Sequence, residues 1–277
     1  MKLTKFNKCI KFIFKTTLSS VFTYIYILLI PLIIEIFLYV YYIKSALDQS
    51  RIILVGSALM YVIPLTSLFI TNLIVSWRET IFLKQIRNFG ITQKTFISSL
   101  FIVYSIYCLF SIIFSIFIVS MVDVIENNHK MTLFLSNFFH NPSNIFSILI
   151  IMVAITFTYF ISVLLSGFIK NIYIIQAISI LFIILSLFTG DYFLDFNYIE
   201  DNYYQFFSYF NLYKYFNWLY YISYTSSFNG GRQLFLIVIY IDNKLSFNNI
   251  YIPLFSSLIV TLSIITSSYL LFKLSTK

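Results

Sequence analysis

Charge is scarce in this chain: only 10% of its 277 residues are Asp, Glu, Lys or Arg. A soluble domain carries nearer ~25% charged residues, so this sequence cannot cover itself with the polar surface that water requires. Hydrophobic residues instead make up 60% of the chain, and the mean hydropathy is +0.90. These values exclude a soluble globular protein and predict an all-α integral membrane protein.

Motifs for chemistry are also lacking. None of the six glycines begins a GxxxxGK[ST] phosphate loop, which excludes nucleotide hydrolysis by that route. Cys9 lies in a basic segment and Cys108 in the middle of an apolar run, so neither a disulfide nor a CxxC metal site is predicted. His129 and His140 are expected in one polar outer loop between the third and fourth runs, eleven residues apart, and lack metal-ligand spacing. Without a Ser/His/acid set facing a common pocket, we expect no catalytic residue, no metal and no cofactor bound by this chain.

Long apolar runs, by contrast, are abundant. A helix needs about 20 residues to cross a bilayer, and six runs are near this length: about 20–42, 52–75, 96–122, 145–169, 172–190 and 250–272. No internal repeat or Gly/Ser linker divides them, so residues 1–277 are predicted to form one membrane domain. With a cytoplasmic N-terminus, 12 of the 18 Lys and Arg lie inside and 8 of the 10 acidic residues outside. Both termini are therefore predicted to be cytoplasmic, and the net charge of +8 is assigned to the membrane surface rather than to nucleic acid.

Residues 1–18 are predicted to form a basic amphipathic helix. At 100° per residue, one side carries Leu3, Phe6, Ile10, Ile13 and Phe14, and the other carries Lys5, Lys8, Lys11 and Lys15; Phe12 breaks the pattern. Such a helix lies in the inner headgroup region, with its lysines on anionic lipid. The alternative is an ordinary positive-inside anchor for the first span.

The connection at about 191–249 is long and aromatic. Residues 203–225 are apolar but are interrupted by Gln205, Asn211, Lys214 and Asn217, and a seventh span here would put Lys273 and Lys277 outside. We predict two short re-entrant half-helices, which a membrane tolerates only where protein covers their polar backbone. Residues 233–241 are too short to span as a helix and predict a buried strand or a re-entrant return.

Glu35 is the one ionisable residue well inside a predicted span, where an unpaired carboxylate is costly. It lies four residues after Pro31, whose missing N–H frees a backbone carbonyl one turn earlier. Two interpretations stay open: a polar contact in a substrate path or a gating pair with Arg51, or else an interhelical hydrogen bond or a side chain reaching the outer interface. Pro64, in the middle of the second run, predicts a kink, either where a moving helix bends or as a static feature.

The connector between the second and third runs, residues 76–95, concentrates charge in Arg78, Glu79, Lys84, Arg87 and Lys94. On a helical wheel one side carries Phe82, Leu83, Ile86 and Phe89, and a second apolar edge carries Trp77 and Ile81. The helix is expected to stop at Gly90. A short helix of this kind suits docking in a groove on a partner protein; another membrane-surface helix is the alternative.

Here the sequence resembles the permeases of type-2 ABC exporters. That family has a basic amphipathic helix at the N-terminus, six spans, both termini inside, a coupling helix between spans two and three, and re-entrant short helices between spans five and six. Its coupling segment often reads Arg-Glu, then Gly-Thr, a Leu, a basic residue and a Pro- or Gly-Ile/Val-Ser/Thr step. This chain supplies Arg78-Glu79, Leu83, Lys84, Arg87 and Gly90-Ile91-Thr92, and departs at Ile81, where many members have Gly.

The resemblance implies a permease subunit of the bacterial plasma membrane rather than an enzyme. It would pair with a second permease, identical or related, and with two ABC ATPase subunits that hold ATP and Mg²⁺. Coupling to the ATPase would fall to Arg78, Glu79, Phe82, Leu83, Ile86 and Arg87, while Glu35 and Pro64 are assigned to a substrate path.

The few charges within the spans suit amphipathic or apolar cargo, and small permeases of this kind resemble exporters of membrane-active or bacteriocin-like peptides, for secretion or self-protection. Lipid, drug and lipid-linked glycan remain open as cargo. From a different class, a non-transporting membrane sensor or assembly scaffold is the alternative, with the connector docking a signalling partner.

Overall fold

The computed structural model describes residues 2–43, 48–79, 90–127, 129–169, 171–192, 202–229, 246–247 and 249–275. Within these ranges the regular structure is entirely helical. Six stretches are long and apolar enough to cross a membrane: Val21–Tyr41, Ile53–Arg78, Gln93–Ile125, Pro142–Phe168, Ile172–Thr189 and Tyr251–Phe272. They coincide with the six predicted runs, and their ends differ from the prediction by three residues or fewer.

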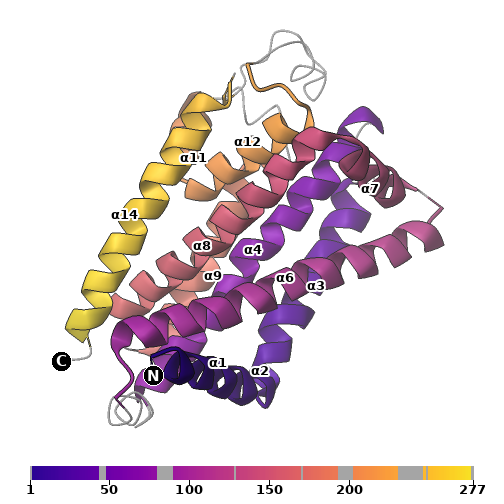
Figure 1. Ribbon diagram of the computed structural model, residues 1–277. Helices are drawn as coiled ribbons and strands as arrows, with labels where there is room; N and C mark the ends of the chain where they lie inside the picture. Colours follow the sequence, from indigo (N-terminus) through magenta and orange to yellow (C-terminus); the bar gives the residue numbers. More distant parts are fainter. Residues whose placement is uncertain are drawn as a thin grey trace.

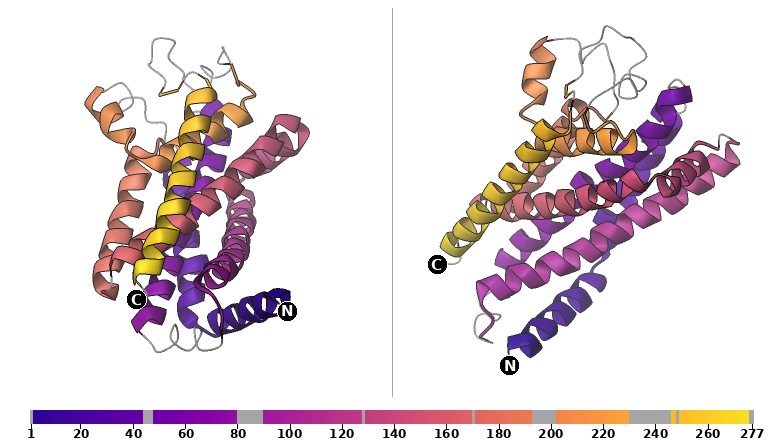
Figure 2. Two further views of the ribbon diagram at one scale, coloured as in Figure 1. Left: turned by 60° about the vertical axis from the view of Figure 1, so that its left-hand side comes forward. Right: turned by 45° about the horizontal axis from the view of Figure 1, so that its top comes forward.

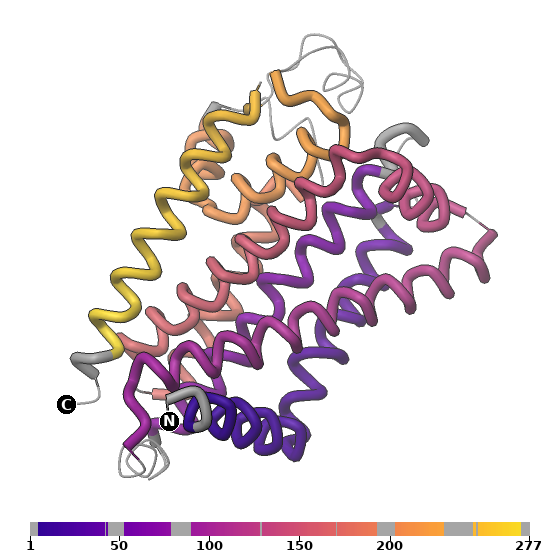
Figure 3. Tube along the Cα trace, viewed as in Figure 1, coloured from indigo at the N-terminus to yellow at the C-terminus, as the bar shows by residue number. Residues whose placement is uncertain are grey.

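The helices follow one another along a single bundle (Figure 1). In chain order they are α1 (Lys2–Leu18), α2 (Val21–Tyr24), the π-helix η1 (Ile25–Leu29), α3 (Ile30–Phe37), the π-helix η2 (Leu38–Ile43), α4 (Asp48–Glu79), α6 (Gln93–Ile125), α7 (Lys130–His140), the 3-10 turn η3 (Pro142–Asn144), α8 (Ile145–Phe168), α9 (Ile172–Thr189), α11 (Asn202–Ser208), α12 (Leu212–Tyr224) and α14 (Tyr251–Ser275). The chain trace in Figure 3 places α1 and the last turns of α14 at one end of the bundle, with α1 crossing beneath it, and α12 at the other end.

α4 is the central helix. Its most apolar window is 100% buried by the rest of the chain, whereas those of the other five spans are 50% buried or less. It packs against α6, α8, α9 and α12, and both views of Figure 2 show it inside the bundle. α4 carries the buried polar residues Ser57, Thr66, Thr71 and Asn72, and such side chains in a span favour contact with other helices over contact with lipid, which accounts for this position.

The first span changes its winding around Pro31. Proline has no N–H, so the carbonyl of Ile27, four residues earlier, has no intrahelical donor. The Ser111 hydroxyl of α6 donates to this carbonyl at 2.6 Å. The carbonyl that the sequence predicted to be free is therefore satisfied by a neighbouring helix, which is how a bilayer tolerates proline inside a span.

The connection between the third and fourth spans was expected to be a polar loop, and here the structure corrects the prediction. It contains the helix α7, whose Met131 and Phe134 side chains are buried. Asp123, near the end of α6, accepts hydrogen bonds from the backbone N–H groups of Lys130 (3.0 Å) and Met131 (2.9 Å). The side chain that caps the first turn of α7 therefore comes from the preceding helix.

The connection between the fifth and sixth spans contains two short helices, α11 and α12, as the sequence predicted. α12 is buried along most of its length, although it contains Lys214 and Asn217. Re-entry of these helices into the membrane stays a prediction, and residues 233–241 lie outside the described residues.

Candidate functional site

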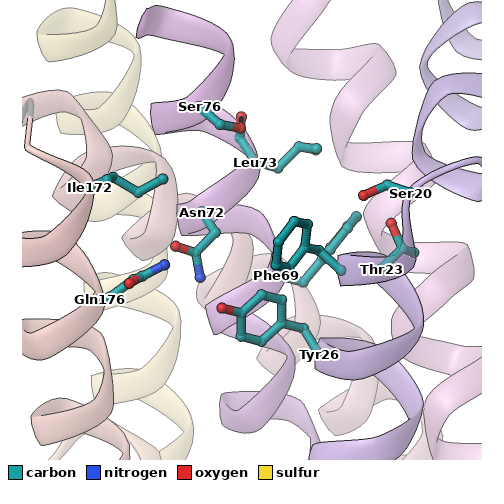
Figure 4. A pocket seen from close by; sticks show the side chains of 10 residues that line it. Ser20, Thr23, Tyr26, Phe69, Asn72, Leu73, Ser76, Ile172 and Gln176 are labelled. Atoms are coloured by element: carbon teal, nitrogen blue, oxygen red, sulfur yellow. Dashed lines mark hydrogen bonds between the residues drawn. The ribbon is translucent and has the colours of Figure 1, made fainter.

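A cleft of about 160 Å³ opens between the start of the first span, the last third of α4 and the start of α9. We call it the α2–α4–α9 cleft. Its polar lining includes Tyr26, Asn72 and Gln176, and its apolar lining includes Phe22, Phe69 and Leu73. Figure 4 shows the amide groups of Asn72 and Gln176 turned toward each other, with the Tyr26 hydroxyl pointing toward the same space.

Asn72 supplies this cleft with a hydrogen-bond acceptor for a ligand. Its side chain is only 9% exposed, and its Nδ2 donates to the carbonyl of Leu68 at 2.8 Å, within its own helix. The Oδ1 atom, however, has no hydrogen-bond partner. Buried polar atoms are nearly always hydrogen-bonded, so an acceptor left open beside a cleft can receive a donor from a ligand.

The rest of the lining supports the same chemistry. Phe69 is buried and faces the cleft, while Phe22 is exposed at its edge. Thr23 and Ser76 line it too, but their hydroxyls already donate to the backbone carbonyls of Thr17 (2.6 Å) and Leu73 (3.0 Å). The cleft therefore combines one open acceptor with an apolar wall, which fits a small group that carries a hydrogen-bond donor on an apolar body.

Glu35, predicted for a substrate path, lies on α3 and not in this cleft. Its side chain is 2% exposed and its Oε1 has no hydrogen-bond partner. A gating pair with Arg51 stays a prediction, because that side chain lies outside the described residues. Pro64 lies inside α4, as expected.

Arg78, predicted to contact a partner, is engaged within its own chain. Its guanidinium donates to the carbonyls of Ser166 and of Gly167 (3.4 Å), at the C-terminal end of α8, and it lies over the ring of Phe272 in α14 at 5.8 Å. Carbonyls at a helix end lack intrahelical donors, and a cation there is favourable. Arg78 thus ties the end of α4 to α8 and α14.

The side chains of the other residues predicted to couple to the ATPase fall outside the described residues. The backbone of Glu79 closes α4, but its side chain is outside the described residues, and so is all of 80–89, which includes Phe82, Leu83, Ile86 and Arg87. The description resumes at Gly90, whose φ of +68° suits the residue after a helix end. The coupling helix and its contacts with a partner stay a prediction.

The four lysines Lys5, Lys8, Lys11 and Lys15 are exposed along α1, and their contact with anionic lipid stays a prediction. The opposite face of α1 packs on α6: Ile13 and Cys9 are buried, and the Thr17 and Tyr107 hydroxyls are hydrogen-bonded at 2.8 Å. A Cβ built on Gly90 would lie 3.3 Å from the Nζ of Lys5. The start of α1 therefore lies beside the end of the connector.

Six helices long and apolar enough to cross a membrane define the class: a multi-pass α-helical membrane protein. No family model and no curated protein matches the chain. The described residues also contain no group of three His, Cys, Asp or Glu side chains able to hold a metal ion. The type-2 permease resemblance accordingly rests on the connector residues and on the order of the elements.

Sequence reasoning missed the cleft. Its signal was present, because Asn72 and Gln176 are amide side chains inside runs that are otherwise apolar. The sequence did not show which elements surround these two amides, because a polar residue in a span can face a neighbouring helix, a cavity or a partner. Only the packing of α4 against α9 brings the two amides to one cleft.

Proposed function

We propose that this chain is the membrane-spanning permease subunit of an ATP-driven exporter, powered by two ABC ATPase subunits on separate chains and paired with a second permease. The observation that carries the proposal is the order of the elements: a basic helix across the end of the bundle, six spans, and a pair of short helices between the fifth and sixth. The connector residues Arg78-Glu79 and Gly90-Ile91-Thr92 agree with the family pattern.

Coupling would act through α4. An ATPase that grips residues 77–89 pulls on the end of α4, which is bound through Arg78 to α8 and α14 and packs along α6 and α9. Movement of α4 therefore reaches the other spans through direct contacts. Such coupling requires the docked connector to bind the two ATPase states with different free energies.

The cargo we propose is amphipathic, with membrane-active or bacteriocin-like peptides as the first candidate. The α2–α4–α9 cleft supports it, because the open Oδ1 of Asn72 accepts a donor and Phe22, Phe69 and Leu73 supply an apolar wall. Its volume of about 160 Å³ admits one side chain or the end of an acyl chain, rather than a whole drug-sized molecule, which needs about 300 Å³ or more. The cleft is thus a subsite for part of the cargo.

Purification with the candidate ATPase tests the function. We expect an ABC ATPase encoded beside this gene to copurify with the chain and to be stimulated by it, and we expect Glu79→Lys combined with Arg87→Glu to abolish both effects. Lys15→Glu, a charge reversal on exposed α1, is the control and should leave assembly intact. Unchanged assembly and stimulation in the double variant would remove the coupling role, and a copurifying protein that is not an ATPase would favour the sensor or scaffold alternative.

Sensitivity to peptides tests the cargo. A strain that lacks the gene should change in its sensitivity to, or secretion of, membrane-active peptides, and wild type should restore it. Asn72→Leu removes the open acceptor and should restore less, whereas Thr266→Val, at an exposed position of α14, should restore fully. If the deletion changes neither sensitivity nor secretion, peptides are the wrong cargo; equal restoration by both variants would leave Asn72 without a role.

A further inference from the structure

The end of α9 is completed by side chains of α11, α12 and the turn between them, residues 202–224, which we call the cap. The last carbonyls of a helix have no intrahelical donor. Here the side-chain amides of Asn211 and Asn217 donate to the carbonyls of Ser186 and Gly190, each at 3.0 Å. The phenol of Tyr221 lies 2.8 Å from the carbonyl of Asp191, to which it donates. The phenol of Tyr204 donates to the carbonyl of Phe188. The cap is therefore hydrogen-bonded to four of the carbonyls between Ser186 and Asp191, in the last turn of α9 and the two residues after it.

A buried ion pair closes this contact. The Nζ of Lys214 in α12 lies 3.1 Å from the Oδ2 of Asp191, and both side chains are 0% exposed. The same oxygen accepts from the indole Nε1 of Trp218 at 2.6 Å and from the Ser246 hydroxyl at 3.0 Å. One carboxylate oxygen thus joins the end of α9, the cap and the segment that leads to α14.

Lys214 is held from the cap side as well. It donates to the hydroxyl of Ser208 and lies 4.5 Å above the ring centre of Tyr209. Burial lowers the pKa of its ammonium, and the carboxylate of Asp191 opposes that shift. The cation belongs to the cap and the anion to the turn that follows α9, so each depends on the other segment for its partner.

Beside the ion pair lies a buried polar seam formed by Ser57 of α4 with Asn217 and Tyr221 of the cap. Ser57 donates to the Oδ1 of Asn217 at 3.0 Å, and its Oγ lies 2.8 Å from the hydroxyl oxygen of Tyr221, whose single hydrogen is shared between Ser57 and the carbonyl of Asp191. All three side chains are buried. If the cap moves away from α9 and α4, water can replace each hydrogen bond that these polar groups give up, so their hydration costs little free energy.

We propose that the Asp191–Lys214 pair is a latch: while it is closed, the cap seals the polar seam, and when it opens, the cap leaves α9 and water enters the seam. The physical basis is that a buried pair is tolerated together, whereas either charge alone is strongly unfavourable in a dry site. If the cap separates from the end of α9, both charges become exposed at once. The pair therefore favours two distinct states, one with the charges in contact and one with both charges hydrated. This inference depends neither on the cargo nor on an ATPase.

Cysteine labelling tests the latch. In a chain with Cys9 and Cys108 replaced by Ala, Ser57→Cys places a small thiol in the seam, and the protein is reconstituted in nanodiscs that leave both faces open to water. A charged methanethiosulfonate reagent should label it slowly while the pair is intact. With Lys214→Met the labelling rate should rise by about tenfold or more, because Asp191 is left as a lone charge. Exchanging the two residues, Asp191→Lys with Lys214→Asp, should restore most of the protection.

Two further variants keep the test decisive. Trp218→Phe removes one donor to Asp191 but leaves the charges paired, so it should give an intermediate rate even if Lys214→Met does not fold. Tyr215→Phe removes a hydrogen bond inside the cap, to the carbonyl of Tyr209 at 3.0 Å, and should leave the labelling rate of the thiol unchanged. The proposal is overturned if the folded variants all label at the intact rate, if the exchanged pair labels as fast as the single variant, or if Tyr215→Phe opens the seam equally.

Discussion

At Gly56 the phenol of Tyr220, from α12, lies against the backbone of α4. A Cβ built on it would lie 1.9 Å from the Oη of Tyr220 and 2.9 Å from the Cε2 of Phe134. The Tyr220 hydroxyl that occupies this space donates to the carbonyl of Ile53 at 3.1 Å. The glycine therefore admits a phenol that hydrogen-bonds to the backbone of the central helix.

We expect Gly56→Ala to lower the free energy of unfolding by about 1–3 kcal/mol, because the added methyl must displace the Tyr220 ring. Gly167→Ala is the matched control: its nearest contact, the Cβ of Leu271, would be an ordinary 3.7 Å, and alanine is the better helix former. Thermal unfolding of the purified protein in detergent measures both. Equal stabilities for the two variants would mean that Tyr220 moves aside without cost.

At the scale of single residues, the sequence predicted which side chains would be unusual but not what they do. Glu35 was recognised as a buried acid, and it is buried. Asp191 and Lys214 were assigned to a connection, yet they form a fully buried ion pair. They are 23 positions apart in sequence, and no periodic pattern relates residues that are brought together by the end of one helix and the side of another.

At the scale of helices, α7 shows what local pattern leaves out. An isolated helix of eleven residues is marginal in water, and the stretch around it reads as a polar loop. Its two supports come from elsewhere in the chain: the carboxylate of Asp123, and a buried contact of Met131 and Phe134 with the body of the bundle, where α7 packs on α4. The long apolar helices, by contrast, needed no partner to be recognised.

Replacing Asp123 should release the start of α7. We expect Asp123→Ala to cost about 1–2 kcal/mol, as the loss of a helix cap does, and to speed hydrogen exchange at the amides of Lys130 and Met131. Exchange in α14 should stay the same. Ser136→Ala, on the exposed side of α7, is the control and should leave both rates unchanged. Faster exchange throughout the protein would point to global destabilisation instead of a local cap.

At the scale of the whole molecule, the even number of spans puts α1 and the end of α14 at one end of the bundle and the cap at the other. The charge bias predicts that the end with α1 is cytoplasmic. Exposed positions exist at both ends, with Ser19 after α1 and Tyr203 in α11. The predicted orientation can therefore be tested with one reporter at each end.

In the same cysteine-free background, a membrane-impermeant maleimide should label Tyr203→Cys in intact cells, and should label Ser19→Cys only after permeabilisation. The reason is that each reporter is exposed but on a different side of the bilayer. The reverse pattern would invert the orientation, and labelling of both from outside would contradict the five crossings that separate Ser19 from Tyr203.

The sequence by itself determined that this is a membrane protein with six spans, because a bilayer selects on the length and apolarity of continuous runs, which are local properties of the chain. Only the tertiary structure decided that α4 is central, that Asn72 opens on a cleft with Gln176, that Arg78 is bound to the end of α8, and that Asp191 pairs with Lys214. In each of these cases the arrangement is stabilised by contacts between residues far apart in sequence. Which of these residues come into contact depends on which helices become neighbours. Side-chain packing, rather than composition, decides which helices are neighbours.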